Sequence, residues 1–566
     1  MLTLLSAVIF LLLMGPSMLR SADERVKKGF IRISYAKVKK LTLRKRQTLV
    51  YLGQGYSFGP SHARRLYALM AQGSLGSSVQ DFSTHGNGLI HELERHNSKP
   101  VLFLEKDLGG HTMVFGTTGS GKTRLFELLI FQALQRGDAV IVLDPKGDRD
   151  LRNRMKHACD TFRKSDFFEL DVLNEYSNIV FDLLGTDEDS GQLASRLASL
   201  IEGGGSASSF KAYAHMGIKN AIDTLYLRGH RPTVDAIRTV LLNPTVYTET
   251  IYTFFRQLIN REGMEEARVY YERIAGAEAE NGRDRKNSGL NLYKGLYVWL
   301  RHKKLLNERE QTCLESVFGA AAYESSYYLK ITAGIIPVLD SLTGRRLQKL
   351  LEPKKADFDR TVLDFARIID KRLVFYTALH CLSDSVSGSN LGRLMLSSLA
   401  SVAGRIYAAG KSQSRVSIFV DEASELVSEE MLQLLNKSRG AGFAMTLATQ
   451  TAADFAARSG SERMIAQIIG NCNNLISLRS KDLESARIIA STLPKTTVAT
   501  LSSSVTLAEN VKAHLGISES VSRSVSMREC PLFPAEALMQ LPDLEYVASL
   551  ADGRFIKGKI PFLYAP

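Results

Sequence analysis

The sequence predicts an α/β protein in which a parallel sheet binds a nucleotide and a long helical segment interrupts the sheet. A phosphate-binding loop at 116–123 lies between an apolar strand and a helix. Buried strands that end in polar residues resume only late in the chain, so 299 residues separate Lys122 from Asp421. Between them, residues 210–347 show helical spacing with hardly any alternating strand pattern. These three observations predict a nucleotide-binding sheet with an inserted all-α domain.

Length and composition agree with a large globular protein. The 566 residues allow two to four domains, 45% are hydrophobic, and 23% are charged. This composition excludes a coiled coil, a collagen-like chain and a polytopic membrane protein. The five cysteines are scattered without metal-ligand spacing, which argues against a disulfide framework or a zinc site.

The strongest local signal is the phosphate-binding loop. The sequence GTTGSGKT follows Met113–Phe115 and precedes the apolar helical run LFELLIFQAL, which is the strand–loop–helix context that this motif requires. Glycines allow the backbone N–H groups to face the phosphates, Lys122 reaches the β- and γ-phosphates, and Thr123 ligates Mg2+. The predicted nucleotide-binding residues are Gly116, Thr117, Thr118, Gly119, Ser120, Gly121, Lys122 and Thr123.

The next strand, 139–143, ends in the turn Asp-Pro-Lys-Gly-Asp at 144–148 and completes a βαβ unit. Asp144 and Asp148 lie where such a strand meets its ligand, but Asp-Pro-x-Gly-Asp is also a turn sequence. Both interpretations stay open at this point.

The second half of the sheet supplies candidates for hydrolysis. The strand 416–420 ends in Asp421 and Glu422, which are suited to the Mg2+ shell and to polarising the attacking water. The strand 443–448 leads to Gln450, a polar amide suited to sensing the γ-phosphate. Arg439 lies between them, either as an arginine finger for a neighbouring subunit or as an ordinary solvated arginine at a helix end.

The N-terminus combines an apolar run with a basic block. Leu2–Leu19 carries no charge, and eleven basic residues against two acidic ones follow in 20–46, so +9 of the formal net charge of +13 lies there. Because the cations follow the apolar run and no small-residue cleavage site is evident, we expect a single membrane span rather than a secretory signal. The predicted divisions are a transmembrane anchor (1–19), a basic juxtamembrane segment (20–50), a nucleotide-binding domain (51–200 and 351–566) and an all-α domain (201–350).

Two later segments have weaker patterns. Residues 494–527 are rich in Ser, Thr and Val, which fits a mobile loop or a β-hairpin near a central pore. Residues 546–550 and 554–560 flank Ala-Asp-Gly and predict a terminal hairpin.

Together these motifs resemble the type IV coupling proteins, the TraD/TraG-type ATPases of bacterial conjugation and type IV secretion. The resemblance rests on GTTGSGKT, DPKGD, FVDEAS, RGAGFAMTLATQT and RECPLFPAEALMQLP, and it extends from about Tyr51 to the C-terminus. Members usually begin with two transmembrane helices around a small periplasmic segment, whereas this sequence shows one apolar run.

The resemblance implies a RecA-like motor that hydrolyses ATP with Mg2+, forms a homohexamer and is anchored in the bacterial inner membrane with most of its mass cytoplasmic. It further implies that relaxase-bound single-stranded DNA passes from relaxosome proteins to a type IV secretion channel. Lys122 and Thr123 would bind nucleotide and Mg2+, Asp421 and Glu422 would be the Walker B pair, Gln450 the sensor and Arg439 the finger. Two alternatives remain: an FtsK-like DNA translocase, and a docking receptor in which ATP only sets conformation.

Overall fold

The computed structural model describes most of the chain from Ile31 to Tyr564. The described residues are 31–44, 47–71, 86, 90, 98–108, 110–175, 177–185, 189–201, 207–280, 285–323, 328, 332–354, 359–410, 415–509 and 517–564. The predicted transmembrane segment Leu2–Leu19 and residues 20–30 and 45–46 of the basic block lie outside them. Within the described residues, no helix is both long and apolar enough to span a membrane.

A 12-stranded sheet forms the centre of the molecule. Its core of parallel strands confirms the predicted α/β class. In spatial order these strands are β13 (Cys472–Ser477), β5 (His111–Phe115), β12 (Phe443–Thr449), β11 (Val416–Val420), β6 (Ala139–Asp144), β10 (Val374–Ala378) and β7 (Phe167–Asp171).

An antiparallel extension continues the sheet beyond β13. It contains β16 (Glu545–Ser549), β17 (Phe555–Lys559), β3 (Gln47–Ser57), β2 (Leu43–Arg44) and β4 (Lys99–Leu104). The strands β16 and β17 are the predicted terminal hairpin, with Gly553 in its turn at φ 82°. Beside it, the short β1 (Arg32–Ser34) pairs in parallel with β18 (Phe562–Tyr564).

Helices cover both faces of the sheet because its central strands are buried on both sides. Along β6, Val140 and Val142 belong to one hydrophobic cluster, and Ile141 and Leu143 belong to the other. The first cluster includes α2 (Tyr35–Thr42), α5 (Lys122–Arg136) and α6 (Arg149–Phe162). The second includes α3 (Pro60–Ala71), α17 (Phe365–Asp370), α18 (Ser385–Ala408), α19 (Glu429–Lys437), α20 (Ala452–Ser459), α21 (Glu462–Asn471), α22 (Leu483–Thr492) and α23 (Ala535–Leu538).

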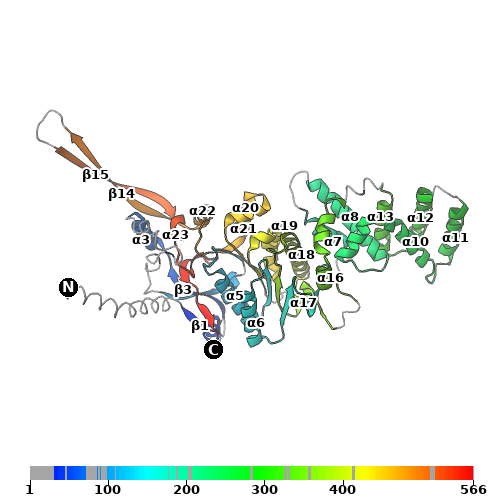
Figure 1. The fold of residues 1–566 in the computed structure, drawn as a ribbon, viewed down its shortest axis with the longest axis horizontal. Coiled ribbons are helices and arrows are strands. Elements are labelled where there is room, and N and C mark those ends of the chain that lie inside the picture. The colour runs from blue at the N-terminus through cyan, green and yellow to red at the C-terminus, as the bar shows by residue number, and fades with distance from the viewer. Residues whose placement is uncertain are drawn as a thin grey trace, which may run out of the picture.

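The helical segment leaves and re-enters the sheet through a short parallel pair, β8 (Ile179–Phe181) and β9 (Thr361–Leu363). All described elements between these two strands are helices: α7 (Ser190–Ala198), α8 (Ala207–Leu227), α9 (Val234–Leu242), α10 (Thr245–Leu258), α11 (Glu265–Glu280), α12 (Arg285–His302), α13 (Glu308–Ala321), α15 (Ile336–Leu342) and α16 (Arg345–Leu351). They extend to one end of an elongated molecule (Figure 1). The exact domain divisions stay predictions.

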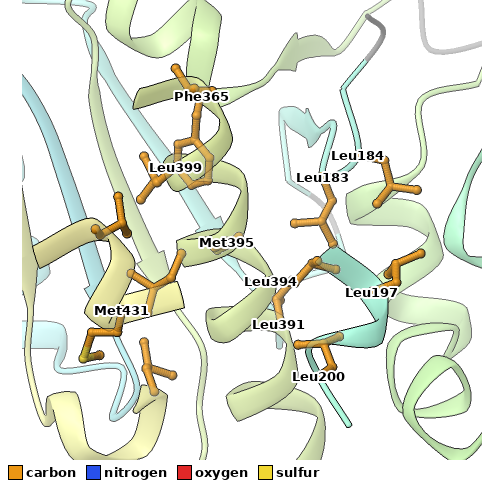
Figure 2. Packing of buried hydrophobic residues seen from close by; sticks show 14 of the residues in the cluster. Leu183, Leu184, Leu197, Leu200, Phe365, Leu391, Leu394, Met395, Leu399 and Met431 are labelled. Atoms are coloured by element: carbon orange, nitrogen blue, oxygen red, sulfur yellow. The ribbon is translucent and has the colours of Figure 1, made fainter. Parts of the chain in front are cut away.

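The long helix α18 joins the helical region to the sheet. Its Leu391 and Leu394 face Leu197 and Leu200 at α7 and just beyond it, whereas Leu399 lies beside Phe365 of α17 (Figure 2). All of these side chains are buried. The helical region therefore shares a hydrophobic core with the sheet's second face.

A second long feature projects from the opposite end of the molecule. Strands β14 (Lys495–Glu509) and β15 (Ile517–Pro531) pair antiparallel over fifteen positions and extend away from the sheet (Figure 1). Of the two interpretations for 494–527, the hairpin is the one observed. Its placement near a pore stays a prediction.

Candidate nucleotide-binding site

The phosphate-binding loop connects β5 to α5 at the carboxyl edge of the sheet. Gly119 and Gly121 have φ of 80° and 116°, conformations in which a side chain is strained. The Ser120 hydroxyl donates to the Thr117 carbonyl at 2.6 Å, and the Thr117 N–H donates to the Arg479 carbonyl at 2.9 Å. The loop is thus stabilised by a hydrogen bond within it and by one to the segment that follows β13. The N-terminus of α5 is left available to bind an anion.

Lys122 is nearly buried at the start of α5. Its ammonium donates to the Gly116 carbonyl at 2.6 Å and lies 3.5 Å from a Glu422 carboxylate oxygen. The Lys122 side chain therefore lies between the loop and the residues that follow β11, where a β- or γ-phosphate would bind.

The acidic pair follows β11 directly. Asp421 is buried, and Glu422 has the left-handed φ of 46°, which is uncommon outside glycine and concentrated at functional sites. Burial, Glu422 and Asp144 raise the pKa of Asp421 to about 7, in that order of importance. Because the ionised form of Asp421 is destabilised at this position, a bound cation beside it would stabilise that form.

Gln450 links the acidic pair to the phosphate-binding loop. Its amide nitrogen donates to Glu422 at 3.0 Å, and its amide oxygen accepts from the Thr118 hydroxyl at 3.1 Å. Thr118, Gln450, Glu422 and Lys122 therefore form one chain of polar contacts across the sheet's edge.

These groups line a cavity of about 840 Å3. Of the predicted residues, it is lined by Thr117, Thr118, Gly119, Gly121, Lys122, Thr123, Asp421, Glu422 and Gln450. Gly116 and Ser120 shape the loop behind it. The polar lining fits Mg2+, which keeps several waters and takes one or two protein oxygens plus phosphate oxygens.

Arg439 lies elsewhere. It belongs to the 3-10 turn Ser438–Ala441 just before β12, so it occupies the amino edge of the sheet and is exposed. It contributes to lowering the pKa of His111, the first residue of β5, to about 4, although burial is the main cause. The five residues of β5 separate that end from the phosphate-binding loop by roughly 13 Å. Arg439 is therefore outside the cavity of its own chain.

The structure also supplies residues that the motifs did not indicate. Arg458 of α20 forms a 2.7 Å ion pair with Glu425, and both line the cavity. Arg124 and Phe562 line it as well, with the guanidinium 5.3 Å from the ring centre. Arg124 and Glu425 lie beside the two motifs in the sequence, whereas Arg458 and Phe562 come from distant segments.

Asp144 has a structural role in the turn after β6. Its carboxylate accepts from the backbone N–H groups of Lys146, Gly147 and Asp148 at 2.6–2.9 Å and from the Tyr376 hydroxyl at 2.6 Å. Asp148 in turn caps α6 by accepting from the Asp150 N–H at 2.8 Å. These contacts favour the turn interpretation of DPKGD for Asp144.

We expect Asp144→Ala to reduce the free energy of unfolding by about 2–4 kcal/mol, because three backbone N–H groups and the buried Tyr376 hydroxyl lose their acceptor. Asp148→Ala removes only a helix cap and should cost about 1 kcal/mol. Urea unfolding of the two variants measures the difference. Equal losses in both would contradict the central role of Asp144 in this turn.

The parallel core, the loop after β5 and the acidic pair after β11 define a P-loop nucleotide-binding fold. A family model described as the TraM recognition site of TraD and TraG matches residues 415–543, and one described as the central domain of helicase HerA matches residues 91–199. The type 4 coupling protein DotL of Legionella pneumophila is 38% identical over 58 residues, which are 10% of this chain and 7% of DotL.

Solved structures with a similar arrangement include the bacterial conjugative coupling protein TrwBdeltaN70 in its unbound form, with 13% identity, a TM-score of 0.48 and 94% coverage of both chains. Another is TrwB in complex with ADP and Mg2+, with 13% identity, a TM-score of 0.47 and coverage of 95% of this chain and 94% of that one. The family-model matches agree with the resemblance in the motifs. Over these segments the chain is similar to the type IV coupling proteins.

Proposed function

We propose that this protein is an ATP-driven coupling protein that links a relaxosome to a type IV secretion channel and pumps DNA through a homohexamer. The observation that carries the proposal is the convergence of Lys122, Glu422 and Gln450 in one cavity. The match to the TraM recognition site of TraD and TraG, which includes the segment from β11 to Asp543, supports a relaxosome partner. Membrane anchoring by Leu2–Leu19 and single-stranded cargo belong to the same proposal.

The chemistry follows from the positions of the side chains. When a triphosphate binds, Lys122 exchanges its contact with the Gly116 carbonyl for phosphate oxygens, and the loop N–H groups surround the phosphates. Thr123 and Asp421 are the residues that would hold Mg2+, which neutralises charge on the phosphates.

Glu422 acts on the water. Its carboxylate accepts a proton as the water attacks, and the 3.0 Å hydrogen bond from Gln450 fixes its orientation. Because Gln450 also contacts Thr118, departure of the γ-phosphate changes contacts on β12 as well as in the loop. This provides a route from hydrolysis to movement of the sheet.

The proposal is tested with Lys122→Ala in purified protein and in cells. We expect loss of ATP binding, loss of DNA-stimulated hydrolysis and loss of mating, because the main cation for the β- and γ-phosphates is gone. Lys146→Ala, which also removes a cation from the cavity lining, is the matched control and should retain most activity. Mating at wild-type frequency by Lys122→Ala would overturn the motor function.

A further inference from the structure

The sheet's strand order gives the cavity two distinct ends. The strands that carry Gln450, the acidic pair and Asp144 are β12, β11 and β6, all on one side of β5. On the other side of β5 lie β13, β16 and β17. Because Lys122, Glu422 and Gln450 would surround the γ-phosphate, a triphosphate on the loop after β5 would have its γ-end toward β12 and β11 and its nucleoside end toward β16.

The segment before β16 lies directly against the phosphate-binding loop. The Leu544 N–H donates to the Ser120 carbonyl at 2.9 Å, and a Cβ on Gly121 would come within 2.8 Å of a Leu544 methyl. Arg479 holds the same segment through the Leu541 carbonyl at 3.1 Å and an ion pair with Asp543. Residues 541–544 therefore form one wall of the cavity, which backbone hydrogen bonds and an ion pair fix against the phosphate-binding loop.

The last strand of the chain completes the wall. Phe562 of β18 is held by its N–H, which donates to the Ile31 carbonyl at 2.8 Å, and by parallel pairing with β1. Its ring lies 5.3 Å from the guanidinium of Arg124, on the first turn of α5. Glu127 accepts a hydrogen bond from Arg124 at 2.9 Å and so holds that guanidinium in place. A flat guanidinium and an aromatic ring thus line the cavity together, beside the apolar Leu544.

We infer that Arg124, Leu544 and Phe562 form the subsite for the nucleotide's purine base, with Phe562 as its stacking surface. This inference rests on the proposed function of the same cavity. Aromatic rings bind bases through their faces, and the larger face of a purine stacks more strongly than that of a pyrimidine, so the subsite favours purines without strong discrimination between adenine and guanine. The base then bridges α5 and the C-terminal strand, two segments more than 400 residues apart in sequence.

The test compares nucleotides with a triphosphate that has no base. Calorimetric titration with Mg2+ present should show that Phe562→Ala weakens ATP and GTP binding by about 10-fold, in line with the contribution of base stacking on an aromatic side chain. Binding of inorganic tripolyphosphate should not change. Tyr564→Ala is the matched control, because Tyr564 is an exposed aromatic residue of the same strand and does not line the cavity.

Two further measurements keep the outcomes distinct. The preference for ATP over CTP should fall in Phe562→Ala and persist in Phe562→Trp, which retains an aromatic face. Equal weakening of ATP and tripolyphosphate, or unchanged ATP binding, would overturn the base subsite. Failure of the wild-type protein to bind either ligand would instead overturn the proposed function, so the two failures are separable.

Discussion

Glu422→Gln is expected to lower kcat for DNA-stimulated ATP hydrolysis by about 10²–10⁴-fold, the usual range for loss of a general base. Glutamine has nearly the same shape and still offers an oxygen to the Gln450 amide, so the polar chain to Thr118 persists. The Kd for ATP should therefore change little, and the variant should trap bound nucleotide. Rapid-quench hydrolysis and equilibrium binding measure the two quantities separately.

The cavity supplies a matched control for this substitution. Glu425 lines the same cavity three residues later, but its carboxylate is paired with Arg458 at 2.7 Å. Glu425→Gln should leave kcat within a few-fold of the wild type. If both substitutions lowered kcat equally, the carboxylates would act through the charge of the cavity, and the assignment of Glu422 as base would be wrong.

Local sequence signals indicated that Lys122, Asp421 and Gln450 lie at the carboxyl ends of buried strands, and the structure brings all three into one cavity. Their strands are buried on both faces as expected, and their catalytic roles stay predictions. Because carboxyl ends of parallel strands meet at one edge, placing three such strands in one sheet brings their following residues together. The order of the strands was not needed for that conclusion.

The nucleoside half of the cavity had no comparable signal. Phe562 reaches Arg124 only because β18 pairs with β1 beside α5, and no pattern in a three-residue strand specifies such a partner. The Arg458–Glu425 pair is similar, since α20 meets the turn after β11 through tertiary packing. Sequence periodicity specifies which face of an element is buried, whereas these contacts depend on which elements are neighbours.

For the turn after β6, the sequence could not decide the role of one residue. Its sequence left Asp144 open between catalysis and turn formation, because the same carboxylate suits both. Three backbone N–H groups and the Tyr376 hydroxyl occupy its oxygens in the structure. Tyr376 lies on β10, more than 200 residues away, so this partner was also beyond local sequence reasoning.

Arg439 shows how the position of a residue limits its possible roles. It is exposed at the amino edge of the sheet, whereas Lys122 and Glu422 lie at the carboxyl edge. An arginine finger stabilises charge that develops on the phosphates, so it must approach them directly. Within one chain Arg439 does not line the cavity, and any such role therefore requires the phosphates of a neighbouring subunit.

Mixing experiments test that requirement. If Arg439 acts on a neighbour, Arg439→Ala should lower ATPase activity by about 10³-fold, near the lower end for loss of an arginine finger. Nucleotide binding and the free energy of unfolding should stay near wild-type values, because the side chain is exposed. Lys437→Ala, which removes an exposed cation two residues away, should have little effect.

The decisive measurement titrates Arg439→Ala chains into wild-type protein at constant total concentration. Each variant chain carries an intact cavity for its own nucleotide but deprives one neighbour of the finger, so activity should fall more steeply than the wild-type fraction when subunits act in sequence. Adding Lys122→Ala chains, which retain Arg439, should restore activity to Arg439→Ala chains, because the two defects then fall in different cavities. Wild-type activity of Arg439→Ala would place Arg439 among ordinary surface arginines, and a strictly linear decline with no restoration would exclude its action on a neighbouring subunit.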